Sequence, residues 1–213
     1  VTVSESLLPV LPEVLARIKN LFDLSCEPMA VYETLQVMNT LQPGLCVLGT
    51  RLPGCFNVFE MSVRAVLGQQ ITVKAASTLA ARLVAVYGTQ VQTGIEGLTH
   101  SFPAPAAILA LGENISEHLG KLGIISARAN TIYQLARVLA DEKNDFGFCG
   151  NPEEEMQKLQ AIRGIGSWTA QYIAMRAMGW PDAFLPTDAG IKKALPDHTP
   201  KELQVLSEAW RPW

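Results

Sequence analysis

The stretch that most constrains the fold is LQAIRGIGSWTAQYIAM, residues 159–175, in which Gly164 and Gly166 interrupt a helical pattern. Apolar residues recur at helical spacing on both sides of the interruption: Leu159, Ile162, Ala170 and Ile173. Glycine adopts backbone angles that other residues disfavour, so the turn between the two helices can be tight. The pattern predicts two packed helices joined by a short, rigid hairpin.

Such a hairpin can bind an anion through its backbone. The second helix begins with N–H groups that have no partner inside the helix, and the helix dipole adds partial positive charge there. These donors suit a DNA phosphate, and the missing side chains of Gly164 and Gly166 would let the phosphate come close. An ordinary corner between two helices has the same glycine spacing, so the spacing alone leaves both interpretations open.

The remainder of the chain also reads as helical. Ser126 is expected to cap a helix that runs to about Asp141, and Pro152 followed by three glutamates is a strong helix start. The predicted helical segments are 56–66, 72–87, 126–141, 152–162, 167–178, 188–195 and 199–210. No series of alternating strands is present, and the sequence predicts an all-α fold.

Composition excludes several classes of protein. No apolar run approaches the roughly 18–20 residues of a membrane span, and no signal peptide opens the chain. The four cysteines are scattered and the three histidines lie far apart, which argues against a thiolate or histidine metal site. We expect a cytoplasmic protein with reduced thiols and no cofactor. The net charge of −3 disfavours nucleic-acid binding unless the contact is local.

Two aromatic side chains and one carboxylate stand out near the hairpin. Trp168 and Tyr172 lie four residues apart and share one helix face, where they could be core or could edge a slot for a flat base. Asp188, in LPTDAGIKKAL, stands at a helix start and could be an N-cap. Thr187 could cap that helix instead, which would leave Asp188 to point elsewhere.

Several ordered motifs resemble one family. LQAIRGIGSWTAQYIAMRAMGWPDAFLPTDAGIKKAL resembles the helix-hairpin-helix (HhH-GPD) DNA glycosylase superfamily. RLPGCFNVFEMSVRAVLGQQITVKAASTLAARLVAVYG, FDLSCEP and AWRPW resemble its 3-methyladenine DNA glycosylase II (AlkA-type) branch. The resemblance spans nearly the whole chain. It implies an enzyme that flips a damaged base out of duplex DNA and cuts the N-glycosidic bond.

The resemblance also implies roles for individual residues. Asp188 matches the catalytic aspartate, and Trp168 and Tyr172 match aromatics of the base pocket. Gln70 matches the position that fills the gap left by the flipped nucleotide, although the branch pattern has an apolar residue there. The DNA-contacting hairpin residues would be Gly164, Gly166, Ser167 and Thr169. An alkali ion could bind the backbone carbonyls of Gln160, Ile162 and Ile165.

One departure from related enzymes bears on mechanism. Bifunctional members carry a lysine nucleophile where this chain has Trp168, so the resemblance implies water as the nucleophile and no strand-cleaving step. The closely spaced cysteines of an iron–sulfur cluster are absent from the sequence. The β-rich N-terminal domain of the branch is expected to precede Val1, and a final helix to follow Trp213, so that a fragment lacking them could be inactive.

The expected organisation has three parts and a cleft. Residues 1–57 would be a helical segment packing with the C-terminal helices, residues 58–180 a helical domain with the helix-hairpin-helix at about 153–178, and residues 181–213 the C-terminal helices with the catalytic loop. The two helical subdomains would enclose a cleft between them. The expected partner is double-stranded DNA with alkylated bases, bound by a monomer, with no membrane contact, in a bacterial cytoplasm at the nucleoid.

Three other interpretations remain open. A non-catalytic helix-hairpin-helix module would bind DNA without Asp188 chemistry, and a glycosylase could instead act on oxidised or mismatched bases. A helical protein–protein interaction domain would account for the acidic net charge but not for the Gly-Ile-Gly turn. The best-supported prediction is a monofunctional glycosylase for alkylated purines of the 3-methyladenine type.

Overall fold

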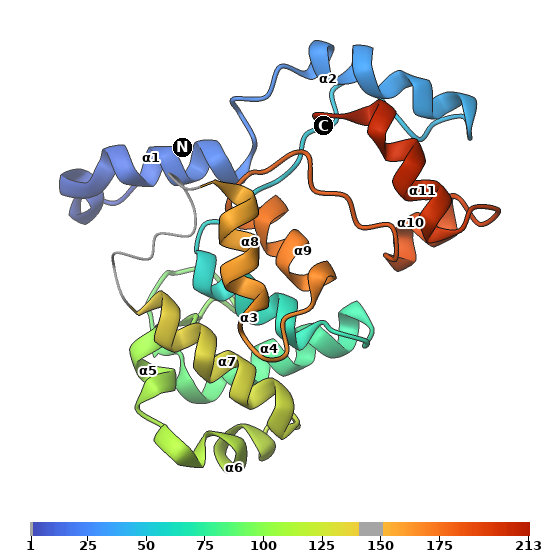
Figure 1. Cartoon of the computed structure of the whole chain (residues 1–213). Helices are drawn as coiled ribbons and strands as arrows, with labels where there is room; N and C mark the ends of the chain where they lie inside the picture. Colours follow the sequence, from blue (N-terminus) through green and yellow to red (C-terminus); the bar gives the residue numbers. More distant parts are fainter. Residues whose placement is uncertain (1, 141–150) are drawn as a thin grey trace. The chain divides into compact units, whose positions relative to one another are not determined.

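The computed structural model describes residues 2–140 and 151–213, and these form eleven α-helices and one short strand pair (Figure 1). The all-α prediction is confirmed. The chain separates into two compact units: unit 1 comprises Val1–Phe56 and Ala174–Trp213, and unit 2 comprises Asn57–Ile173. None of the helices among the described residues is long and apolar enough to cross a bilayer.

Unit 1 contains four complete helices. They are α1 (Leu11–Leu21), α2 (Pro28–Leu35), α10 (Ala189–Ala194) and α11 (Pro200–Ser207). Short 3-10 turns η1 (Glu5–Val10), η2 (Gln36–Thr40) and η4 (Glu208–Trp210) accompany them. Helix α9 (Ser167–Ala177) begins in unit 2 and ends in unit 1.

The described residues of unit 2 contain the first helix of the hairpin together with the helices that precede it. They are α3 (Val58–Leu67), α4 (Val73–Tyr87), α5 (Pro105–Leu109), α6 (Ile115–Gly120), α7 (Ser126–Leu139) and α8 (Pro152–Gln160), with the 3-10 turn η3 (Gly112–Asn114). Strands β1 (Thr89–Gln90) and β2 (His100–Ser101) pair antiparallel after α4. Neither strand nor α5 and α6 is among the segments that the sequence predicts.

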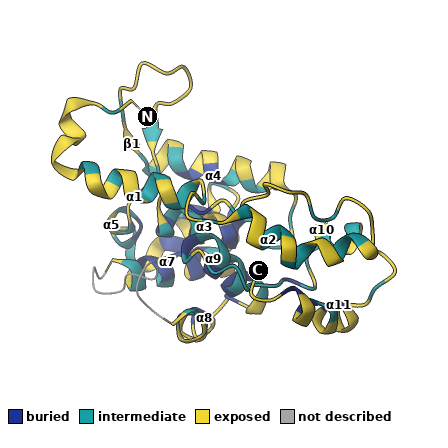
Figure 2. Cartoon of the chain, turned by 90° about the horizontal axis from the view of Figure 1, so that it is seen from above, coloured by how far each residue is buried: buried dark blue, intermediate teal, exposed yellow. Residues whose placement is uncertain are grey.

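Helix α7 is the centre of unit 2 and packs against α3, α5 and α6. Its apolar face is fully buried at Ile132 and Leu135, and the buried residues of this unit gather around α3 and α7 in Figure 2. Leu159 of α8 and Ile173 of α9 are also buried, at 1% and 0% exposure. The apolar spacing on both sides of the glycines therefore does place the two hairpin helices against a core.

Polar caps decide where several helices begin. Asn57 accepts a hydrogen bond from the N–H of Glu60, and Thr72 accepts one from Ala75, at 2.8 and 3.2 Å. Asn151 caps α8 just before Pro152, as the helix-start signal requires. The predicted cap at Ser126 is wrong, because Ser126 is the first helical residue of α7 and follows the extended residue Ile125. The predicted end near Asp141 lies outside the described residues.

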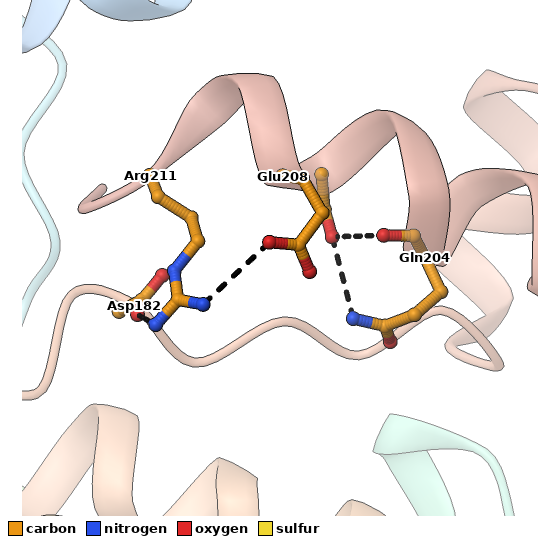
Figure 3. Close-up of polar contacts among 5 residues, drawn as sticks. Asp182, Gln204, Glu208 and Arg211 are labelled. Carbon is orange, nitrogen blue, oxygen red and sulfur yellow. Dashed lines mark hydrogen bonds and ion pairs between the residues drawn. The ribbon is translucent and has the colours of Figure 1, made fainter.

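In unit 1 the C-terminal helices have their own apolar core. Leu195, Leu203 and Trp210 are buried together, and the ring of Phe184 meets Trp210 edge-on at 5.5 Å between centroids. Arg211 forms an ion pair with Asp182 at 2.6 Å and lies 3.6 Å from Glu208, while Gln204 contacts the Ser207 hydroxyl (Figure 3). Phe184 and Asp182 thus attach the loop that precedes α10 to α11 and the residues after it.

Helix α11 has a capping box whose stability should depend on pH. The Thr199 backbone N–H and hydroxyl donate to Glu202 Oε2 at 2.7 and 2.8 Å, and these bonds hold the pKa of Glu202 below its ordinary value. A carboxyl with a lowered folded-state pKa stabilises the fold above its unfolded pKa, and this contribution disappears as the pH falls through the folded pKa.

We therefore expect Glu202→Gln to unfold at lower denaturant concentration than wild type at pH 7, because the neutral amide accepts more weakly. The difference should shrink as the pH is lowered below about 4, where an aspartate or glutamate begins to protonate. Urea unfolding at several pH values measures it. A difference that is constant from pH 7 to pH 3 would contradict the capping role.

Candidate functional site

The hairpin turn is made possible by Gly164. Its φ is +98°, in the left-handed region that favours glycine, and a Cβ added there would collide with the Oγ1 atom of Thr131. The Thr131 hydroxyl lies 2.9 Å from the carbonyl oxygen of Arg163, to which it donates. Ile162 and Ile165 are buried, and the Ile165 N–H donates to the Ile162 carbonyl at 3.0 Å. The turn is therefore fixed to α7 as well as to its own helices.

Gly166 has a different function from Gly164 in this turn. Its φ lies outside the left-handed region and a Cβ added to it would meet no atom within 4 Å. The fold therefore does not require glycine here. Gly166 and Ser167 are both exposed at the start of α9, whose first-turn N–H groups have no acceptor within the helix. An open Cβ position beside such donors is what the close approach of an anion needs.

The side chain of Thr169 is buried and bonded within the protein, which limits how this residue could contact DNA. The residue is only 3% exposed, and its hydroxyl accepts a hydrogen bond from Gln69 Nε2 at 3.0 Å. The side chain is thereby directed into unit 2. A DNA contact of Thr169 remains a prediction for its backbone N–H alone. Ser167 is exposed, and its hydroxyl lies 3.3 Å from Nε2 of Gln171.

Trp168 and Tyr172 lie on one face of α9, as their spacing predicts, and they contact each other. The ring centroids are 5.1 Å apart and the planes differ by 7°, so the two rings are stacked. Both side chains are half-buried. A base therefore would not enter between the rings in this arrangement; it would have to stack on the outer face of the pair.

Asp188 caps α10 itself, so the alternative in which Thr187 caps this helix is wrong. The Oδ1 atom of Asp188 accepts the N–H of Gly190 at 2.7 Å, and the carboxylate is half-buried. Asp188 lies in unit 1, whereas Trp168 and Tyr172 lie in unit 2. The cleft expected between the two helical subdomains, with Asp188 facing the aromatic pair, stays a prediction.

Gln70 is exposed in the loop between α3 and α4 and has a positive φ of 55°. A left-handed backbone is uncommon for a residue other than glycine and costs free energy, so the surrounding structure must hold it. Sequence reasoning missed the neighbouring residue Gln69, whose side chain contacts the hairpin. The only signal was the polar Gln-Gln pair after the buried end of α3.

The backbone carbonyls proposed for an alkali ion lie at the end of α8 and in the turn, at Gln160, Ile162 and Ile165. A carbonyl oxygen has two lone pairs, so Ile162 could bind an ion while accepting the Ile165 N–H. Neutral oxygen donors of this kind suit a hard cation. Among the described residues, no group of three or more histidine, cysteine, aspartate or glutamate side chains is arranged to hold a metal.

A pocket of about 500 Å³ lies entirely within unit 1. It is lined by residues of α1, of the segment around Arg51 and of the end of α9, with Met175, Met178 and Trp213 among them. Asp188 is not one of the lining residues. This pocket is therefore separate from the residues to which the sequence assigns chemistry.

Family models match almost all of the chain. The model described as the AlkA N-terminal domain matches residues 1–57, and that of the HhH-GPD superfamily base excision DNA repair protein matches residues 63–210. The described part of residues 1–57 contains helices and no strand. Residues 1–57 thus match the family's N-terminal model with helices alone, which is consistent with the expected absence of its β-rich part from the described residues.

Individual relatives of the chain are also named as DNA glycosylases or DNA repair enzymes. The chain is 37% identical over all 213 residues to DNA-3-methyladenine glycosylase 2 of Escherichia coli, of which it spans 72%. It is 38% identical over 204 residues to a probable bifunctional transcriptional activator/DNA repair enzyme AlkA of Mycobacterium tuberculosis, of which it spans 40%. The 3-methyladenine DNA-glycosylase structure from Archaeoglobus fulgidus has the same fold, with a TM-score of 0.74 at 22% identity over 97% of this chain and 70% of that one.

The two hairpin glycines give a matched pair of variants. Gly164→Ala should lower the free energy of unfolding by about 2–4 kcal/mol, because it combines a strained φ with a collision at Thr131. Gly166→Ala should change it by less than about 1 kcal/mol, since its Cβ enters open space. Urea denaturation of both variants compares them. Equal losses of stability would mean that the turn is not organised as described.

Proposed function

We propose that this chain, which belongs to the HhH-GPD superfamily of base excision DNA repair proteins, releases alkylated purines from duplex DNA by hydrolysing the N-glycosidic bond. It is an AlkA-type DNA glycosylase by family. The preference for alkylated purines is supported by similarity, over all of this chain and 72% of the relative, to an enzyme named DNA-3-methyladenine glycosylase 2. The observation that carries the chemistry is the half-buried carboxylate of Asp188, placed at the start of α10.

The hairpin would hold the DNA backbone. The exposed Gly166–Ser167 turn presents the first N–H groups of α9, and backbone donors can bind a phosphate without a large basic surface. This explains how a chain with a net charge of −3 can bind a polyanion. An alkali ion on the Gln160, Ile162 and Ile165 carbonyls would add positive charge beside the phosphate.

Base release places positive charge on the sugar. As the N-glycosidic bond lengthens, the deoxyribose acquires oxocarbenium character, as in other glycoside cleavages. An aspartate is ionised at neutral pH, and a fixed carboxylate stabilises such a cation electrostatically. We assign this function to Asp188, which would also orient the attacking water. The hydrogen bond from the Gly190 N–H to Oδ1 holds the carboxylate in one orientation.

The leaving group explains why a single carboxylate suffices. A purine alkylated on a ring nitrogen carries positive charge, so it departs as a neutral base without protonation by a general acid. The stacked Trp168–Tyr172 pair would receive the flipped, electron-poor base on its outer face, an attraction with a cation–π component. Extrusion itself costs a few kcal/mol and least for damaged bases, which favours lesions over normal pairs. Gln70 would fill the gap.

Asp188→Asn is the direct test of the catalytic assignment. Loss of the charge should slow release of methylated purines by roughly two to three orders of magnitude, the range seen when one electrostatic stabiliser is removed. The matched control is Asp182→Asn in the same loop, whose carboxylate pairs with Arg211 and is expected to be dispensable for chemistry. Release assays with an alkylated duplex would compare them. Near-normal release by Asp188→Asn would end the assignment.

The absence of a lysine at position 168 predicts the course of the reaction. Water attack leaves an intact abasic strand and no Schiff base between protein and sugar. Borohydride added during the reaction should therefore trap no covalent protein–DNA complex. A trapped complex, together with strand cleavage that depends on the protein, would show a bifunctional mechanism instead.

A further inference from the structure

We propose that Gln69 is a positioning residue that connects the hairpin to Gln70, so that holding the DNA phosphate and filling the gap are one coupled event. This inference rests on the proposed function of the hairpin and of Gln70. Gln69 lies in the α3–α4 loop next to Gln70, and all of the residues involved belong to unit 2.

The side-chain amide of Gln69 spans from its loop to both parts of the hairpin. Its Nε2 atom lies 2.9 Å from the carbonyl oxygen of Gly164 and 3.0 Å from the hydroxyl oxygen of Thr169. A backbone carbonyl can only accept, so the amide must present its NH2 group to Gly164, and the two protons of that group serve the two bonds. One side chain thus contacts the turn and the first turn of α9 together.

The main chain of Gln69 is held by a separate hydrogen bond. The guanidinium of Arg128, on α7, donates to the Gln69 carbonyl oxygen. Arg128 is half-buried, and a hydrogen bond from a charged donor is stronger than a neutral one. Helix α7 also holds the hairpin through Thr131 and Arg163. The loop and the hairpin are therefore both attached to the same helix and to each other.

The attachment of Gln69 accounts for the backbone conformation of Gln70. Its left-handed φ of 55° is a conformation that persists only where neighbouring contacts outweigh its cost. The contacts are those of the preceding residue, whose side chain and carbonyl are both engaged. The exposed Gln70 side chain is thereby aimed by bonds that end on the phosphate-binding turn. A residue that only stabilised the core would not have its two donors directed at the hairpin.

The test is a double-mutant cycle read by base flipping rather than by base release. Wild type, Gln69→Ala, Gln70→Ala and the double variant are mixed with a duplex carrying 2-aminopurine at the target position, whose fluorescence rises when the base unstacks. Affinity for an undamaged duplex is measured separately by anisotropy. Gln204→Ala is the matched control, because its amide makes a hydrogen bond in unit 1, away from the hairpin.

Gln69→Ala should reduce the flipping equilibrium by a factor of roughly 5–30, the range that the loss of two hydrogen bonds supports. The double variant should flip no worse than Gln70→Ala, because Gln69 acts through Gln70. Affinity for undamaged duplex should change less than flipping. Gln69→Glu, which keeps the size but removes the donors, should behave as Gln69→Ala, so the test does not depend on one substitution.

Independent, multiplying losses from the two single substitutions would overturn the coupling, as would normal flipping by Gln69→Glu. Normal flipping by Gln70→Ala would also overturn it, because there would be no gap-filling function to position. The fluorescence signal requires no bond cleavage. A wild-type protein that flips 2-aminopurine but releases no methylated purine would therefore count against the proposed reaction and leave this inference standing.

Discussion

The close approach of the Gly164 backbone to Thr131 determines the arrangement of the hairpin and of the hydrogen bonds that join it to its neighbours. A side chain at position 164 would occupy the place of the Thr131 hydroxyl, so the backbone can pass this close only as glycine. That passage lets Thr131 donate to the Arg163 carbonyl and lets the Gly164 carbonyl accept from Gln69. The direction of the first N–H groups of α9 follows from the same turn. A tight turn and a polar network thus depend on one missing Cβ.

The proposed DNA contact depends on backbone dipoles more than on net charge. A chain with 17 basic and 20 acidic residues cannot bind DNA through a general positive field. The backbone N–H groups at the start of α9 are fixed in direction by the fold. A phosphate can approach them most closely where no side chain intervenes, as at Gly166. Asp188 likewise combines two functions in the proposal, since the bond that caps α10 also orients the carboxylate.

Local signals in the sequence predicted the hairpin, whereas the hydrogen-bond partners of its side chains depend on contacts between residues far apart in the sequence. The glycine spacing, the Pro152 start and the apolar faces are local features, and the structure reproduces the helices they indicate. The hydroxyl of Thr169 bonds to Gln69, which is 100 residues away in sequence, and no local pattern reveals such a contact. Ser126 failed as a predicted cap because Ile125 occupies the N-cap position of α7, whereas of the two candidates for α10 it is Asp188 that caps the helix.

If the fixed negative charge of Asp188 stabilises a cationic sugar, the protein should also bind a cationic sugar analogue tightly, which one binding measurement tests without any chemical step. Two duplexes would be compared, one carrying a positively charged pyrrolidine ring in place of the deoxyribose and one carrying a neutral tetrahydrofuran ring. We expect wild type to bind the charged ring at least about tenfold more tightly, a difference of about 1.4 kcal/mol, and Asp188→Asn to lose this preference. Equal affinity of the wild-type protein for the two duplexes would contradict it.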